Sequence, residues 1–342
     1  MIPVVRVSGG PEERGRAAGR ALAEPIHRSL AFYRGYLERR GVRLDSLPRL
    51  LRPFRSSAEA GLPELVAEMD ALAEGADADP WEIFAVNAFE ELEPALSEPS
   101  LERCTSFTAA SPGATILAHN EQWLAGDLGN VAVIVSTPDQ GAAFASPTIA
   151  TCLPAVGMNS AGIAQAIMSL TAGDDREGVP RVLVSRHSLQ ASYTADAIKR
   201  AGLEGRAGGY AHLFAGGSGE AFTVETTADR IAVLEGPGAH TNHYLHQDLT
   251  LIGDRPREGS RSRLERADAL LRASPPTTPQ EAMAVLADHE GDPQPICVHP
   301  DPKDGDDAEA VLFSMVCHLE ERRMWVAPGP PCFTPFEEIE VA

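Results

Sequence analysis

Residues 103–110 read RCTSFTAA, and the spacing of apolar side chains changes at this stretch. Before it, Ile26, Leu30 and Tyr33 recur at the spacing of one helix face, and Gly41 ends that pattern. After it, short runs of β-forming residues follow one another, separated by turn residues. The stretch therefore predicts a helical segment before it and a β-rich segment after it.

Start signals support the helices of the first hundred residues. Residues 10–13 read GPEE, which is typical of a helix start, and a second helix is expected from about Leu62. Asp79 precedes Pro80 and Glu82, which supplies a cap, a proline at the first helical position and an early acid. Ahead of these helices, residues 2–7 form only a short strand-like run.

The later segment predicts strands in blocks, with helices between the blocks. The expected strands are 104–109, 114–119, 131–137, 142–150, 156–159, 163–169, 210–215, 221–226, 230–234, 239–245, 310–318 and 323–327. The expected helices are 180–192, 194–201, 260–272 and 278–289. Blocks of this kind favour two stacked sheets covered by helices, whereas a doubly wound sheet alternates strand and helix singly. We expect an α+β fold, a four-layer αββα sandwich with an N-terminal helical segment, in which residues 1–103 and 104–342 make one globular unit.

Charge narrows the possible partners. The 342-residue chain has 29 basic and 49 acidic side chains, for a net charge of -20. Such a surface repels polyanions, so nucleic acid and anionic membranes are poor candidates as partners. No window approaches the roughly 20 apolar residues of a membrane-spanning helix, and no basic and apolar leader opens the chain. We expect a cytoplasmic protein.

Five cysteines are spread along the chain without a CxxC pair: Cys104, Cys152, Cys297, Cys317 and Cys332. This spacing fits neither a disulfide framework nor a zinc ribbon, and it suits a reducing compartment. Cys104 is the strongest candidate for chemistry because it opens the first predicted strand beside two hydroxyl side chains. A single cysteine on a strand is more often a packed residue than a nucleophile, so position alone leaves both interpretations open.

His240, His243 and His246 recur every third residue and raise the question of a zinc site. On a strand, residues three apart point to opposite faces, so these side chains do not converge on one ion without a bend. Cys297 and His299 add little to a metal interpretation. Residues 216–220 read GGSGE and miss the spacing of a serine hydrolase elbow. We expect neither a metal nor an organic cofactor.

Four runs resemble one family in their order along the chain: RCTS (103–106), AHNEQW (118–123), GMNSAGI (157–163) and HTNH (240–243). Residues 178–180, 216–222 and 329–332 also match, so the similarity covers essentially the whole chain. The family is that of the acyl-CoA:6-aminopenicillanic acid acyltransferases, which are self-processing amidohydrolases of the N-terminal nucleophile superfamily.

The resemblance implies that the precursor cuts its own Arg103–Cys104 bond. Cys104 would then begin a new chain, with its thiol as the nucleophile and its freed α-amine as the base. The resemblance also implies that Asn242 stabilises the oxyanion and that Thr227 keeps the chemistry of a serine hydroxyl found in relatives. Residues 1–103 and 104–342 would stay associated as α and β chains.

This arrangement is chemically sound in itself. A thiol has a pKa of about 8.5, and an α-amine has a pKa of about 7.7–8.0. One N-terminal cysteine therefore supplies both a nucleophile and a base near neutral pH. In the precursor the amine is locked in a peptide bond, so activity is expected only after cleavage. Attack on a carbonyl creates an oxyanion, and each fixed donor to it is worth about 3 kcal/mol.

The sequence differs from the family pattern at two places, and these differences limit which family properties can be expected here. Gln122 stands where many relatives have an aspartate, and Glu121 lies one place earlier. Gln122 can hold a substrate or the Cys104 amine but has no charge, so Glu121 is expected to take over in cleavage or catalysis. Asp307 and Ala308 replace a serine–arginine pair, which removes a fixed partner for an anionic substrate. The cysteine mechanism is therefore carried over, and the substrate is not.

We expect a self-processing N-terminal cysteine amidohydrolase or acyltransferase that acts on a small N-acyl substrate through an S-acyl enzyme. One alternative is a family member that has lost catalysis and serves as a binding or scaffold protein. Another is a metallohydrolase built on the His240 cluster. The absence of an S-acyl adduct on Cys104 would favour the first alternative, and full activity after exhaustive chelation would remove the second.

Overall fold

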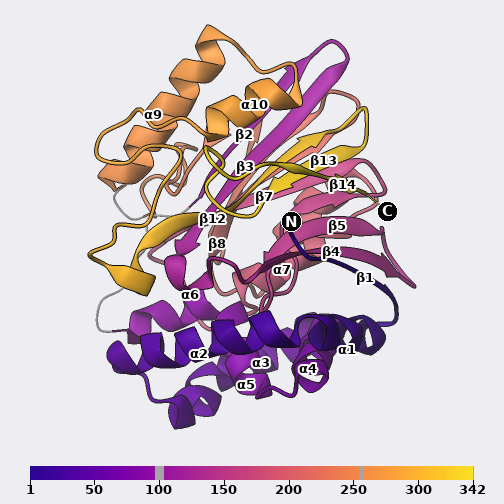
Figure 1. The fold of residues 1–342 in the computed structure, drawn as a ribbon, viewed down its shortest axis with the longest axis vertical. Helices are drawn as coiled ribbons and strands as arrows, with labels where there is room; N and C mark the ends of the chain where they lie inside the picture. The colour runs from indigo at the N-terminus through magenta and orange to yellow at the C-terminus, as the bar shows by residue number, and fades with distance from the viewer. Residues whose placement is uncertain (97–103, 254–256, 342) are drawn as a thin grey trace.

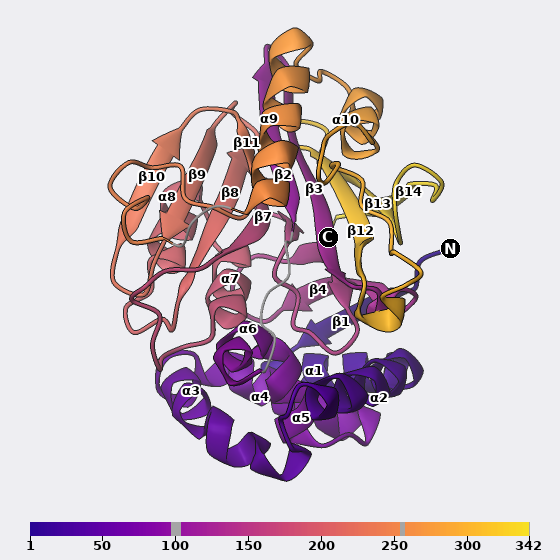
Figure 2. The same cartoon turned by 90° about the vertical axis from the view of Figure 1, so that its left-hand side faces the viewer.

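Two β-sheets form the centre of the protein, in a computed structural model that describes residues 1–96, 104–253 and 257–341 (Figures 1 and 2). The eight-stranded sheet has the order β1-β4-β5-β6-β7-β8-β9-β10. Its strands are β1 (Val4–Gly9), β4 (Val131–Pro138), β5 (Phe144–Ile149), β6 (Gly157–Asn159), β7 (Ile163–Leu170), β8 (Gly209–Gly216), β9 (Ala221–Thr226) and β10 (Ile231–Glu235). The six-stranded sheet has the order β11-β2-β3-β12-β13-β14. Its strands are β11 (Ala239–His240), β2 (Thr105–Ser111), β3 (Ala114–Leu124), β12 (Glu309–His318), β13 (Arg323–Ala327) and β14 (Glu337–Glu340).

The sheets pack face to face through apolar side chains. On β3, Leu117 belongs to the core between the sheets, whereas Ile116 and Ala118 belong to a cluster on the outer face. A strand that is covered on both sides alternates in this way, with successive side chains pointing to opposite faces. The alternation decides which later side chains of β3 reach the space between the sheets.

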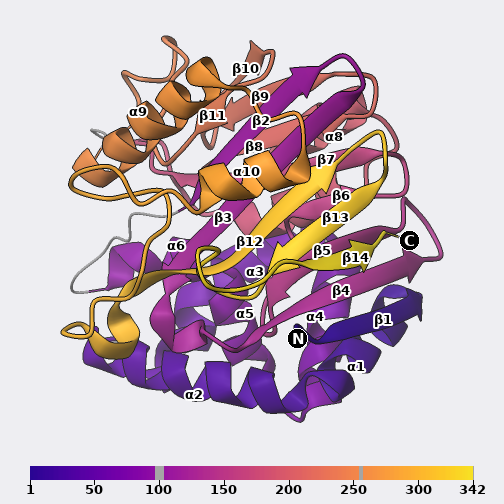
Figure 3. The same ribbon diagram turned by 45° about the horizontal axis from the view of Figure 1, so that its top comes forward.

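Helices α9 (Glu258–Ala273) and α10 (Pro279–Leu286) cover the outer face of the six-stranded sheet, and Figure 3 shows α10 lying across β3 and β12. Leu286 of α10 packs in one cluster with Phe107 of β2 and Val316 of β12. Thr278 starts α10 with a capping box, in which its hydroxyl accepts from the Glu281 backbone N–H at 3.3 Å.

Helices α7 (Arg181–Leu189) and α8 (Thr194–Ala201) lie on the outer side of the eight-stranded sheet, where Ala197 packs with Phe214 and Val224. The remaining helices pack against the β1 and β4 end of that sheet. They are α1 (Pro11–Ala21), α2 (Ala23–Arg39), α3 (Leu47–Gly61), α4 (Pro63–Ala76), α5 (Pro80–Asn87) and α6 (Phe89–Leu92). The layers run helix, sheet, sheet, helix, which confirms the predicted αββα sandwich and its α+β class.

The N-terminal segment is not purely helical, which corrects the prediction for residues 1–103. Its strand-like run becomes β1, which pairs in parallel with β4 so that Val4 lies opposite Val133. Helix α3 was not predicted, because Pro53 interrupts its apolar pattern from inside the helix. Strand β11 is shorter than the predicted run over 239–245, and β14 was not predicted. Among the described residues, no helix combines the length and apolar character needed to cross a membrane.

Candidate active site

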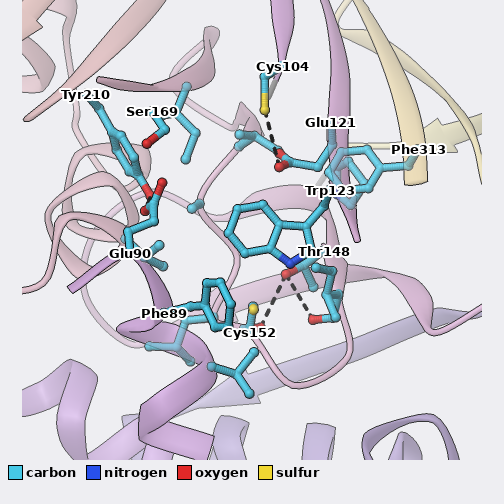
Figure 4. A pocket seen from close by; sticks show the side chains of 18 of the residues that line it. Phe89, Glu90, Cys104, Glu121, Trp123, Thr148, Cys152, Ser169, Tyr210 and Phe313 are labelled. Atoms are coloured by element: carbon cyan, nitrogen blue, oxygen red, sulfur yellow. Dashed lines mark hydrogen bonds between the residues drawn. The ribbon is translucent and has the colours of Figure 1, made fainter. Parts of the chain in front are cut away.

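A pocket lies beside the start of β2, walled by both sheets and by α5 and α6. Its cavity volume is about 80 Å³, several times the roughly 10–15 Å³ that one water needs. Most of the wall is apolar, including aromatic rings from α6, β3 and β12. Figure 4 labels ten of the lining residues: Phe89, Glu90, Cys104, Glu121, Trp123, Thr148, Cys152, Ser169, Tyr210 and Phe313.

Cys104 directly precedes β2, and its sulfur points toward Glu121 in the pocket (Figure 4). The thiol donates to Glu121 Oε1, with 3.3 Å between sulfur and oxygen. Burial raises the pKa of the Cys104 thiol well above its ordinary value, and the charge of Glu121 raises it further. In the uncut chain the thiol is therefore protonated, and a proton acceptor lies beside it.

Glu121 is held from its other side by a histidine on the same strand. Nε2 of His119 lies 3.0 Å from Glu121 Oε2, and Nδ1 of His119 lies 2.8 Å from the Ser106 hydroxyl. His119 and Glu121 are two residues apart on β3, so both face the space between the sheets. The result is a hydrogen-bonded chain that runs from the Cys104 thiol to Ser106.

Gln122 points to the opposite face of β3. Its amide donates to Glu309 Oε2 at 2.8 Å, and Gln294 donates to the same oxygen at 3.2 Å. Gln294 Oε1 in turn accepts from Nε of Arg263 at 2.9 Å. The backbone of Gln122 lies close enough to the Cys104 sulfur to lower the pKa of the thiol, against the larger effect of burial. The structure thus puts Glu121 beside the sulfur, whereas the Gln122 side chain belongs to a network that reaches Arg263.

Arg263 on α9 is fully buried and links Cys104 to Asn242. Its Nη1 donates to the Cys104 carbonyl at 2.6 Å and to the Thr105 hydroxyl at 2.8 Å. Its Nη2 donates to Asn242 Oδ1 at 3.1 Å. At the other end of the amide, Asn242 Nδ2 donates to the carbonyl of Ser169, a pocket residue, at 3.2 Å. The Asn242 amide is therefore oriented with its N–H group toward the pocket wall.

Sequence reasoning missed Arg263. Four more arginines lie on or directly before the same helix, at 257, 261, 266 and 272, so the local pattern does not distinguish the buried one. Its helical spacing from Ala267, four residues on and also buried, is the one signal that marks an inward position.

Thr227 does not line the pocket. Its hydroxyl donates to Asp174 at 2.6 Å, and it accepts from the backbone N–H groups of Asp229 at 3.2 Å and Arg230 at 3.0 Å. The hydroxyl therefore holds the turn between β9 and β10. Arg103, on the other side of the predicted cleavage bond, lies outside the described residues.

Four other polar side chains of the pocket wall form two hydrogen-bonded pairs. The Tyr210 hydroxyl donates to Glu90, and burial raises the pKa of Tyr210 well above its ordinary range. Trp123 Nε1 donates to the Tyr33 hydroxyl at 2.6 Å. Because these polar groups have partners within the wall, the pocket offers a mostly apolar surface to a ligand.

The three histidines at 240, 243 and 246 have separate partners and do not converge on one point, as their spacing on a strand predicts. His240 pairs with Glu225 at 2.8 Å, His243 Nδ1 lies 2.8 Å from the Ser260 hydroxyl, and His246 lies 3.8 Å from an oxygen of Asp248. At the pocket wall, the ligand atoms of Cys104, Glu121 and the fully buried His119 lie within 4.8 Å of one another, so this group has the donors for a metal ion. All three also belong to the hydrogen-bonded chain that ends at Ser106.

A family model described as acyl-coenzyme A:6-aminopenicillanic acid acyl-transferase matches residues 109–331. Among solved structures, the chain is similar to a variant of conjugated bile acid hydrolase from Clostridium perfringens, with 11% identity and a TM-score of 0.49 over 69% of this chain and 92% of that one. It is also similar to penicillin V acylase from Agrobacterium tumefaciens, with 14% identity and a TM-score of 0.48 over 69% of this chain and 86% of that one. The family match begins after Cys104 and includes Glu121, Asn242 and Arg263.

Proposed function

The chain belongs to the acyl-coenzyme A:6-aminopenicillanic acid acyl-transferase family, and from this premise we propose that it cuts itself before Cys104 and then acts as an N-terminal cysteine amidohydrolase or acyltransferase. Membership makes it an enzyme of the amide hydrolase and acyltransferase type. One observation carries the proposal: the Cys104 sulfur lies 3.3 Å from a carboxylate oxygen in the wall of an apolar pocket.

Self-cleavage starts with transfer of the thiol proton from Cys104 to Glu121. The thiolate then attacks the carbonyl carbon of Arg103, and the C–N bond to Cys104 breaks as its nitrogen gains a proton. This step gives a thioester and the free α-amine, whose new proton is the one that Glu121 took from the thiol. Water then hydrolyses the thioester to a carboxylate on residue 103 and a free thiol. Glu121 is the base in this step because the amine of Cys104 is still part of the peptide bond.

In the mature enzyme the freed α-amine of Cys104 takes over as the base. The thiol adds to the carbonyl of the substrate amide, and its proton passes through the α-amine to the leaving nitrogen. The substrate amine departs and leaves an S-acyl enzyme. Attack by water gives hydrolysis, and attack by a second amine gives acyl transfer, with the same groups of the protein in both cases.

Asn242 is the proposed donor to the oxyanion. Arg263 fixes the amide by donating to its Oδ1, which leaves Nδ2 at the pocket wall near Ser169. An approaching substrate carbonyl competes with the Ser169 carbonyl for this donor. Arg263 acts as a positioning residue, because it holds both the Cys104 carbonyl and the Asn242 side chain.

The pocket favours an apolar acyl group. Its wall combines the rings of Phe89, Trp123 and Phe313 with aliphatic side chains from β5 and β7. No arginine or lysine lies among the lining residues, which come from the described part of the chain. We therefore propose a small amide whose acyl part is apolar and uncharged.

The five cysteines of the chain have free thiols, which supports a reducing compartment such as the cytoplasm. The contacts between the parts before and after the cleavage point support their lasting association as α and β chains. Strand β1 pairs with β4, and one apolar cluster combines side chains of α2 with side chains of β4 and α7.

Denaturing intact-mass measurement of the purified protein tests the cleavage. We expect two fragments that meet between Arg103 and Cys104, and a Cys104→Ala variant that stays whole. A Cys317→Ala variant, which removes a buried thiol far from Glu121 in the sequence, should still be cut. Uncut wild-type protein with full amidase activity would overturn the mechanism.

Acylation of the cut protein tests the second half of the proposal. A reactive p-nitrophenyl ester of a short fatty acid should leave one acyl group on the peptide that begins with Cys104. Cleaved protein that forms no such adduct would favour a binding or scaffold protein that has lost catalysis.

A further inference from the structure

Four metal-binding side chains from three segments of the chain meet at the surface near α10: His289, Cys297, His299 and Cys332. Each offers one ligand atom, and all four atoms lie within 4.8 Å of one another. Among the residues that the structure describes, this group and the pocket group around Cys104 have donor atoms gathered in this way. We propose that these four side chains, the His–Cys cluster, bind one zinc ion.

The distances within the cluster fit a tetrahedral site. His289 Nε2 lies 3.0 Å from His299 Nε2, and the Cys332 and Cys297 sulfurs lie 3.2 Å and 3.7 Å from that same nitrogen. Zinc bonds of about 2.0–2.1 Å to nitrogen and about 2.3 Å to sulfur place the ligand atoms of a tetrahedron roughly 3.3–3.8 Å apart. These three spacings lie within a few tenths of an ångström of this range, and every other pair of ligand atoms lies within 4.8 Å.

Hydrogen bonding alone does not account for the cluster. The Nε2 atom of a neutral imidazole makes one hydrogen bond, either as donor or as acceptor. At His299 Nε2, however, three polar atoms of other side chains lie within 3.7 Å. An ion at the centre would use all four ligand atoms at once, with loss of the two thiol protons to solvent.

Packing around the cluster holds the ligands in place. Asn120 of β3 donates through Nδ2 to the carbonyls of Leu286 and Ile296, each at 3.0 Å. The Cys297 N–H donates to the Asp288 carbonyl at 3.0 Å, which joins the segment of Cys297 to that of His289. The ring of Phe333 lies 5.2 Å from the His299 ring, next to Cys332 in the sequence. The site is therefore assembled by the fold around it.

The chemistry of the four ligands indicates which metal binds and whether the ion is structural or catalytic. Two thiolates and two imidazoles suit zinc, since hard cations such as magnesium and calcium prefer oxygen ligands. Four protein ligands complete a tetrahedron and leave no open position for a substrate, which indicates a structural ion. The ion would join the end of α10, the segment before β12 and the segment after β13, and it plays no part in the chemistry of Cys104.

Metal analysis of the purified full-length chain, prepared without a histidine tag, tests the site. We expect one zinc per chain by plasma mass spectrometry, and loss of zinc in Cys332→Ala and in His289→Ala. Both side chains are exposed, so neither substitution opens a cavity in the core. His27→Ala and Cys317→Ala should keep the zinc, as matched changes outside the cluster. Cys104→Ala should also keep it, which separates this result from the test of cleavage.

Two further measurements complete the test. Replacement of zinc by cobalt should give the intense visible absorption of tetrahedral cobalt together with a thiolate charge-transfer band, and Cys332→Ala should lose that band. A chelator should lower the Tm of the wild type and leave the Tm of Cys332→Ala unchanged. Wild-type protein that takes up no zinc, or zinc that stays in both ligand variants, would overturn the proposal.

Discussion

Glu121 and Gln122 are adjacent in the sequence but lie on opposite faces of β3. A carboxylate at position 121 reaches the Cys104 sulfur because this face looks into the space between the sheets, whereas position 122 faces Glu309. If the charge were at position 122 instead, the thiol would have no acceptor at this distance. One step along a strand therefore decides which of two similar side chains takes part in proton transfer.

Substitution Glu121→Gln tests this assignment. It keeps the shape of the side chain but removes the proton acceptor, so we expect self-cleavage to slow by roughly 10²–10⁴-fold, the usual range for a general base. Denaturing electrophoresis of freshly refolded protein gives the rate. Glu338→Gln, which changes an exposed carboxylate paired with Arg323, should cleave at the wild-type rate. Normal cleavage in Glu121→Gln would remove Glu121 from the mechanism.

The buried thiol of Cys104 should also show its raised pKa directly in the uncut Glu121→Gln protein. Burial is the largest cause of the shift, so it persists without the carboxylate and keeps the thiol protonated at neutral pH. In urea, the rate at which iodoacetamide labels Cys104 should rise with pH and level off above about pH 8.5, the pKa of a free thiol. In the folded protein the rate should still be rising at that pH. Peptide mapping reads this cysteine separately from the others, and equal pH profiles in the two states would contradict a raised pKa.

Helices α1 and α4 pack at a distance that only glycine allows. A Cβ on Gly15 would press into the backbone carbonyl of Glu68, and one on Gly75 would press into that of Arg16. Neither atom is the end of a flexible side chain, so the helices themselves would have to move apart. The close crossing also positions Glu68, whose carboxylate pairs with the buried Arg14 and Arg186.

Replacement of Gly15 by alanine should therefore destabilise the fold by about 1–3 kcal/mol, as overpacking does elsewhere. Gly35→Ala in α2 is the matched control, because its new Cβ would meet only the end of the Arg39 side chain. That change should be neutral or stabilise by about 0.5–1 kcal/mol, since alanine is the better helix former. Urea unfolding of both variants measures the difference, and equal midpoints would contradict the tight crossing.

Helix starts that depend on neighbouring residues were predicted correctly from the sequence. The cap at Asp79 is observed, where its carboxylate accepts from the Trp81 N–H at 2.8 Å, and so is the capping box at Thr278. Strand β14, which was not predicted, lies at a sheet edge, where pairing with β13 decides the structure rather than the composition of the run itself. The helix α3 is likewise stabilised by its neighbours despite its internal proline.

In the candidate site, too, residues in sequence motifs were predicted, and residues whose role depends on packing against a distant segment were not. Cys104 and Asn242 carry recognisable motifs, and the structure joins them through one residue, Arg263. Arg263 has no motif of its own, because its role depends on burial against a strand that is far away in the sequence. For the same reason Cys297 and His299 carried little weight as metal ligands in the sequence, since the four side chains of the His–Cys cluster come from three segments with no regular spacing.

The whole molecule is one body built from both sides of the cleavage point. Besides the pairing of β1 with β4, the Tyr33 hydroxyl accepts from Trp123 at 2.6 Å, and Arg181 donates to the buried Glu91 at 2.9 Å. At the far end of α2, Arg39 pairs with Asp307 at 2.7 Å. These contacts lie in different parts of the interface, so cutting the chain before Cys104 removes none of them.

The proposed cleavage would nevertheless change the thermodynamics of unfolding. A whole chain unfolds to one molecule, whereas the cut protein unfolds to two, so its stability depends on concentration. Each tenfold rise in concentration should add about 1.4 kcal/mol to the apparent stability of the cut protein. The midpoint of urea unfolding should therefore rise with concentration for the wild type and stay constant for Cys104→Ala. Fragments that separate on a sizing column without denaturant, or a wild-type midpoint that does not move, would show that the two parts do not form the single folding unit described above.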